Sequence, residues 1–108
     1  MAYTNSYAEH EPSRAEIDAL TGPVVLEFGA PWCPHCTAIQ SALEALLQEH
    51  PSIEHIKIYD GRGKPLGRSF RVKLWPSLIF MRDGKVLEQM ARPSQGEMRR
   101  GTEAIVTA

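Results

Sequence analysis

The sequence predicts an α/β fold in which a central β-sheet carries helices on both of its faces. Helical and strand patterns alternate along the chain, and the first strand is a continuous apolar run, as expected for a strand covered on both sides. The chain has 108 residues, 43% of them hydrophobic, which is enough for one compact core. We therefore expect residues 1–108 to form a single domain, with residues 1–12 as a flexible N-terminal arm.

The first half of the chain predicts helix, strand, helix and strand in that order. Ser13-Arg14-Ala15-Glu16 has the form of a capping box and opens a short helix to about residue 20. Residues 24–28 form the first strand. A helix then begins at the first cysteine and runs to about residue 50, because apolar residues recur at helical spacing up to Pro51. Residues 53–59 alternate apolar and polar side chains, which predicts the second strand.

The second half predicts a short helix, a hairpin and a last helix. A basic loop leads into a weak helix over residues 65–70. Residues 78–81 form a strand that Asp83-Gly84 turns into an antiparallel partner at residues 85–90. A second capping box over residues 94–97 opens the last helix, in which Gly101 is an unfavourable residue.

Charge and hydropathy exclude several classes of partner. The net charge is −1, and no nucleic-acid-binding motif is present, so we expect no nucleic acid. No segment approaches the roughly 20 apolar residues that a bilayer requires, and the chain does not start with a secretion signal, so we expect a cytoplasmic protein away from membranes. Five basic residues lie between positions 62 and 73, either as a solvated face or as a patch that steers an acidic partner.

The two cysteines of the chain occur together, in the run Cys33-Pro34-His35-Cys36 between the first strand and the second helix. This short spacing lets one thiolate attack a disulfide while the other thiol resolves the intermediate. A structural zinc site needs four protein ligands, usually as two such pairs. A zinc or Fe–S centre bridging two chains is the remaining metal alternative, and we expect no cofactor.

A disulfide-exchange site requires Cys33 as a thiolate, because the thiolate is the nucleophile. The helix N-terminus offers unpaired N–H groups and the positive end of the helix dipole, and His35 can add a hydrogen bond or a positive charge. Cys36, one turn into the helix, is then the less exposed, resolving thiol.

Glu27 is the single acid inside the first apolar strand. An unpaired buried carboxylate is costly, so we expect Lys57 on the neighbouring strand to be its partner. The alternative is a glutamate at a strand edge that reaches water. We place His55 on a strand face with no part in the dithiol site.

With these features, residues 17–105 resemble the thioredoxin family. The resemblance rests on the element order, on Trp32-Cys33-x-x-Cys36, and on residues at matching positions: Glu27, Phe28, Ala30, Lys57, Pro76 and the Asp83-Gly84 turn. It implies a thioredoxin fold with a mixed central sheet. It also implies a monomeric protein-disulfide oxidoreductase of cell redox homeostasis, which acts on protein disulfides and receives electrons from a reductase or glutathione.

The resemblance also assigns roles to single residues. Glu27 sits behind the second cysteine and helps to move its proton. Pro76 is a cis proline beside the dithiol, and the backbone of Trp75 pairs with an extended substrate segment. Trp32 and Trp75 form an apolar rim on which the partner rests; the alternative for Trp75 is core packing.

Three departures from the family pattern concern the substrate. The pair Pro34-His35 resembles the oxidising DsbA proteins, although the chain has no room for their helical insertion. Gly29 stands where thioredoxins often have tryptophan, and Ala91-Arg92-Pro93 replaces an expected glycine. An oxidase or isomerase of raised potential is therefore the closest functional alternative, and a binding module with an incidental dithiol is a more distant one.

Overall fold

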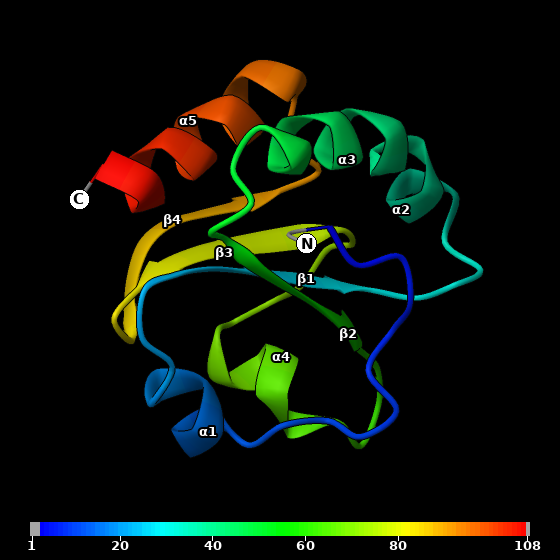
Figure 1. Cartoon of the computed structure of the whole chain (residues 1–108). Helices are drawn as coiled ribbons and strands as arrows, with labels where there is room; N and C mark the ends of the chain where they lie inside the picture. The colour runs from blue at the N-terminus through cyan, green and yellow to red at the C-terminus, as the bar shows by residue number, and fades with distance from the viewer. Residues whose placement is uncertain (1–2, 108) are drawn as a thin grey trace.

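The computed structural model describes residues 3–107, and within them the predicted order of helices and strands is confirmed (Figure 1). The elements are α1 (Arg14–Asp18), β1 (Pro23–Gly29), α2 (Pro34–Ala38), α3 (Gln40–Gln48), β2 (Glu54–Tyr59), α4 (Pro65–Ser69), β3 (Ser77–Arg82), β4 (Lys85–Ala91) and α5 (Gln95–Thr107).

The four strands form one mixed sheet in the order β2-β1-β3-β4. β1 pairs in parallel with β2 and antiparallel with β3, and β3 and β4 form the predicted hairpin. Asp83 and Gly84 both have positive φ angles of 51° and 79°, the backbone of the tight turn that Asp-Gly pairs favour. Figure 1 shows α2, α3 and α5 on one face of the sheet and α1 and α4 on the other. The expected fold, a mixed sheet flanked by helices on both faces, is thus confirmed.

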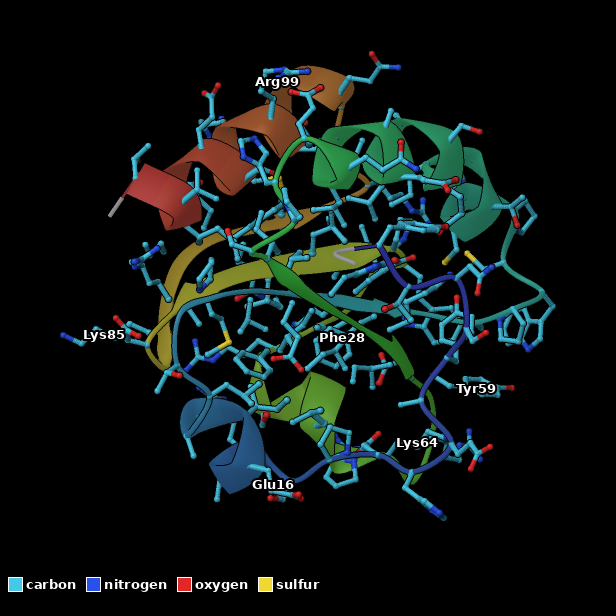
Figure 2. The ribbon with its side chains drawn as sticks, viewed as in Figure 1. Glu16, Phe28, Tyr59, Lys64, Lys85 and Arg99 are labelled. Carbon is cyan, nitrogen blue, oxygen red and sulfur yellow. The ribbon has the colours of Figure 1, made fainter. Side chains whose placement is uncertain are left out.

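Side chains of β1 alternate between two buried layers because successive strand residues face opposite sides. Val25 packs in the layer under α3 and α5, whereas Leu26 and Phe28 pack in the layer over α1 and α4. Figure 2 shows Phe28 between the sheet and α4. By the same alternation, Glu27 shares the face of Val25. The acid of β1 therefore lies beneath the helices that follow the cysteines.

The single helix expected from the first cysteine to residue 50 is divided at Ile39. At this break the carbonyl of Cys36 accepts a hydrogen bond from the side-chain amide of Gln40, at 2.7 Å. A side chain that enters the hydrogen-bond ladder is an established cause of helix kinks. The break turns Gln40 toward the sheet.

Gly101, unfavourable by helix propensity, has a packing reason. A Cβ at this position would lie 2.5 Å from two ring carbons of Phe80, so α5 approaches β3 closely at the glycine. Close packing on the sheet therefore outweighs the cost of a glycine inside a helix.

The N-terminal segment, for which the sequence predicts a flexible arm, is hydrogen-bonded to β2 and α4 at several of its described residues. β2 is an edge strand, and its outer edge is covered by the N-terminal segment, in which the N–H of Ala8 donates to the carbonyl of Lys57 at 2.9 Å. Thr4 is hydrogen-bonded to His55, and Glu11 accepts from the N–H of Leu66. Residues 1 and 2 lie outside the described part of the chain. Backbone groups at the edge of β2 thus hold the N-terminal segment by hydrogen bonds that its composition does not predict.

Among residues 3–107, the helices are all too short or too polar to span a bilayer.

Candidate active site

Cys33 and Cys36 lie where β1 gives way, through a short loop, to α2. Cys33 caps α2: its Sγ accepts a hydrogen bond from the backbone N–H of Cys36 at 3.3 Å. Pro34 is the first residue of the helix, a position at which its missing N–H costs nothing. Both thiols are free, and both residues are buried, with exposed fractions of 6% and 2%. The helix therefore begins at the dithiol, as predicted.

The environments of the two sulfur atoms differ. Burial raises the pKa of the Cys36 thiol to about 12, and its hydrogen bond with Cys33 and the negative charge of Glu27 act in the same direction. The Cys33 sulfur instead receives an N–H donor at the start of a helix, an arrangement that favours an anion. The geometry suits Cys33 as the nucleophile and Cys36 as a thiol that needs a base.

His35 lies on the exposed side of α2, next to the dithiol in sequence. In the described residues no hydrogen bond joins its ring to either cysteine, so the hydrogen bond considered from the sequence is absent. The other contribution considered from the sequence, a positive charge, stays a prediction.

Glu27 is fully buried and lies opposite Lys57 in the register of β1 and β2. The Lys57 Nζ is 3.9 Å from Glu27 Oε2, so the expected pair is present but long. Two shorter contacts complete the site of the carboxylate: Gln40 Nε2 donates to Oε2 at 2.7 Å, and His55 Nε2 lies 2.9 Å from Oε1. Glu27 is therefore a buried carboxylate with three neighbouring donors, not an edge residue that reaches water.

His55 and Gln40 were missed by the sequence analysis. Lys57 Nζ donates to Gln40 Oε1 at 3.2 Å, which links the two sides of this cluster. The sequence did contain a signal for both residues. His55 precedes Lys57 by two positions on one strand, so the two share a face, and Gln40 follows Cys36 by four positions, one helical turn away.

Gly29 leaves space beside Cys36. A Cβ at this position would lie 2.6 Å from Cys36 Sγ and 3.3 Å from the hydroxyl of Tyr7. Tyr7 comes from the N-terminal segment, and with Cys36, Gln40 and Lys57 it lines an open cavity of about 410 Å³. Burial and the nearby Cys36 and Glu27 raise the pKa of Tyr7 above its usual range. A tyrosine from the N-terminus thus reaches the thiol over the glycine.

The two tryptophans form one edge of the site. Trp32 is 67% exposed, and its ring meets that of Trp75 at a centroid distance of 5.4 Å and an angle of 65°. Trp75 is half-buried, packs against the buried cysteines, and donates from Nε1 to Asp60 at 2.8 Å. The Trp75–Pro76 peptide bond is cis, as the resemblance implies. Trp75 combines the packing role with a place on the rim.

Arg92 occupies the region where the sequence departs from the expected glycine. Its φ angle is 49°, and its N–H donates to the carbonyl of Pro76 at 2.8 Å. Its side-chain Nε donates to the carbonyl of Trp75 at 2.9 Å. The side chain therefore contacts the backbone of Trp75, which the resemblance predicts to pair with an extended partner.

The basic stretch at residues 62–73 lies partly beside this edge. Lys64 Nζ stacks over the ring of Tyr59 at 4.4 Å, and Figure 2 shows the two residues on the same side of the molecule. Tyr59 in turn accepts a hydrogen bond from Trp32 Nε1 at 3.2 Å.

Across residues 3–107, no group of three or more His, Cys, Asp or Glu side chains is placed to bind a metal ion within one chain.

Comparison with known proteins places these features in a family. The thioredoxin family model matches residues 7–103. Thioredoxin 2 from Pseudomonas aeruginosa PAO1, in its reduced form, superposes with a TM-score of 0.85 and 40% identity, covering 97% of this chain and 98% of that one. A protein disulfide-isomerase of Hordeum vulgare is 32% identical over 68% of this chain, and thioredoxin H3 of Arabidopsis thaliana is 27% identical over 69%.

The chain spans 16% of the barley protein and 64% of the Arabidopsis protein. The family match nevertheless extends over most of this sequence and includes both cysteines. The chain belongs to the thioredoxin family, and Cys33 and Cys36 are its redox-active pair.

Proposed function

We propose that this protein is a thiol–disulfide oxidoreductase that acts on protein disulfides and contributes to cell redox homeostasis. The observation that supports it most strongly is the unequal environment of the two thiols. Cys33 Sγ receives an N–H donor at 3.3 Å, whereas burial raises the pKa of Cys36 to about 12. Cys33 is placed to act as the nucleophile, and Cys36 stays a neutral thiol until the mixed disulfide forms.

The reaction proceeds in two exchanges. The Cys33 thiolate attacks one sulfur of the substrate disulfide, forms a mixed disulfide and releases the other substrate sulfur as a thiolate. Cys36 then loses its proton to Glu27 and attacks the Cys33 sulfur. The Cys33–Cys36 disulfide forms, and the second substrate thiolate leaves. The substrate gains two electrons, and the protein loses two.

The partner docks along the edge made by the tryptophans and Pro76. Trp32 offers an exposed aromatic face, and Trp75 offers backbone groups ahead of the cis proline. An extended segment adds to this backbone as a strand, with main-chain hydrogen bonds supplying affinity. Arg92, which already donates to the Trp75 carbonyl, competes with one of those hydrogen bonds.

The electron donor is a reductase or glutathione, and the protein works as a monomer in a reducing compartment, the cytoplasm. Such a compartment would keep the pair in the free-thiol form that the structure contains. The neighbouring Tyr59 and Lys64 extend the docking edge with positive charge.

The direction of exchange depends on the reduction potential. Pro34-His35 matches the pair in the oxidising DsbA proteins, and stabilising the reduced dithiol raises the potential. We expect a value between those of thioredoxin and DsbA, about −270 and −120 mV. A value near the upper limit would favour the oxidase or isomerase alternative.

Equilibration against glutathione buffers, with the oxidised fraction read by thiol alkylation and mass spectrometry, measures this potential. The variant P34G/H35P restores the pair common in thioredoxins, and we expect it to lower the potential by tens of millivolts. A wild-type potential at or below about −270 mV would contradict the expectation that Pro34-His35 raises the potential above that of thioredoxin. Metal analysis of the same purified protein tests the bridging-metal alternative.

A further inference from the structure

Glu27 is surrounded by three donors that come from two elements, α3 and β2. Gln40 at the start of α3 donates to Oε2 at 2.7 Å, and His55 on β2 lies 2.9 Å from Oε1. Lys57, also on β2, is 3.9 Å from Oε2. The side chains of Glu27 and His55 are both 0% exposed, so water cannot replace a lost donor.

The N-terminal segment determines which ring nitrogen of His55 carries hydrogen. The backbone N–H of Thr4 donates to His55 Nδ1 at 2.8 Å. A backbone N–H can only donate, so Nδ1 must be the unprotonated acceptor, and the neutral ring carries its hydrogen on Nε2. That nitrogen faces Glu27. The Thr4 hydroxyl makes a separate hydrogen bond to the His55 carbonyl at 3.0 Å.

The same segment determines how the Gln40 amide is turned. The hydroxyl of Tyr3 donates to Gln40 Oε1 at 2.7 Å, and Lys57 donates to the same oxygen at 3.2 Å. The amide nitrogen is thereby directed to Glu27 and to the Cys36 carbonyl, each at 2.7 Å. Tyr3 and Thr4 thus orient both short donors to one carboxylate.

We propose that Tyr3, Thr4 and His55 are positioning residues that direct two N–H donors at Glu27 and keep its carboxylate ionised, ready to accept the Cys36 proton. The inference deepens the proposed function and rests on it. A carboxylate that accepts hydrogen bonds from fixed donors is stabilised in its charged form. The N-terminal segment is therefore a working part of the redox site.

Other ionisable groups also face Glu27, and of these Lys57 adds a positive charge that favours the same ionised carboxylate. Cys36 faces it from α2, Lys57 faces it from β2, and Tyr3 and Tyr7 face it from the N-terminal segment. Burial raises the pKa of both tyrosines above the usual 10, so both phenols stay neutral at neutral pH. Cys36 and Lys57 line the open cavity, whereas Glu27 does not.

The experiment separates the two exchanges with an aromatic disulfide, dithiobis(nitrobenzoate). Cys33 attacks the reagent and releases one thionitrobenzoate; Cys36 then attacks the Cys33 sulfur and releases the second. Stopped-flow absorbance resolves both phases of the full chain as a function of pH. Only the second phase depends on proton transfer from Cys36.

T4P removes the Thr4 N–H, whereas the matched control T4V keeps it and removes only the hydroxyl. We expect T4P to raise the pH at which the second-phase rate is half-maximal by about one pH unit. A shift of this size corresponds to the loss of one hydrogen bond to a charged group. T4V should keep the wild-type profile. Y3F, which loses the donor to Gln40, should move it in the same direction by less.

His55 supplies an independent pair of variants. H55L should shift the second phase as T4P does, and H55Q, which keeps an N–H donor, should restore part of the profile. The first phase should stay unchanged in all of them, whereas a general loss of structure would slow both phases. Second-phase profiles of T4P, Y3F and H55L that overlay the wild type would overturn the proposal. A wild type without a second phase would instead contradict the proposed function.

Discussion

At the level of single residues, the site depends on a difference between two chemically identical side chains. Cys33 caps a helix and receives an N–H donor, while Cys36 is enclosed beside Gly29 and near Glu27. Burial raises the pKa of Cys36 to about 12, so this sulfur is a neutral thiol at physiological pH. Resolution therefore needs a base, and in the proposed mechanism this base is Glu27, the buried carboxylate whose charge acts on Cys36.

The raised pKa of Cys36 makes a prediction about stability. The unfolded chain releases this proton near pH 9, whereas the folded chain holds it to about pH 12, so the folded state binds more protons in that window. The stabilising contribution is complete below about pH 9 and is lost as the pH rises to about 12. We expect the difference in unfolding free energy between reduced wild type and C36A to shrink over this range. Denaturant titrations at several pH values measure it, and a difference that grew with pH would contradict the assignment.

At the level of elements, the segment after β4 contacts the proposed docking edge. Arg92 Nε donates to the Trp75 carbonyl, which an extended partner would also use. We expect R92A to lower KM for a peptide disulfide by roughly two- to tenfold, the range of one exchanged hydrogen bond, with kcat unchanged. R92K keeps the charge but loses the guanidinium geometry, and should lower KM similarly. Steady-state kinetics of both variants check this, and a raised KM in either would count against competition at this carbonyl.

Strands and helix starts could be predicted from sequence because their causes are local. The Ser13 and Ser94 capping boxes and the Asp83-Gly84 turn form as predicted. The break at Ile39 could not be predicted from periodicity, since it accompanies a side chain of α3 that turns toward Glu27. Tertiary contacts override the local pattern there.

At the level of the whole molecule, the sheet order explains what the sequence could and could not show about the site. Parallel pairing sets Glu27 opposite Lys57, as expected from the strands. β2 is also an edge strand, and only the folded sheet shows that residues 3–8 cover it. This segment brings Tyr3 and Thr4 to Gln40 and His55, and Tyr7 to Cys36. Contacts between residues more than 30 positions apart have no local sequence signal.

The central claim, that Cys33 attacks and Cys36 resolves, is tested most directly by trapping the mixed disulfide. Reduced C36S and C33S are each mixed with a defined disulfide-containing protein such as insulin, quenched with acid, and analysed by intact and peptide mass spectrometry, with C33S/C36S as the control. We predict a covalent adduct on Cys33 of C36S that dithiothreitol releases, and none on C33S. An adduct that formed equally on Cys36 of C33S, or none on either variant, would contradict the account.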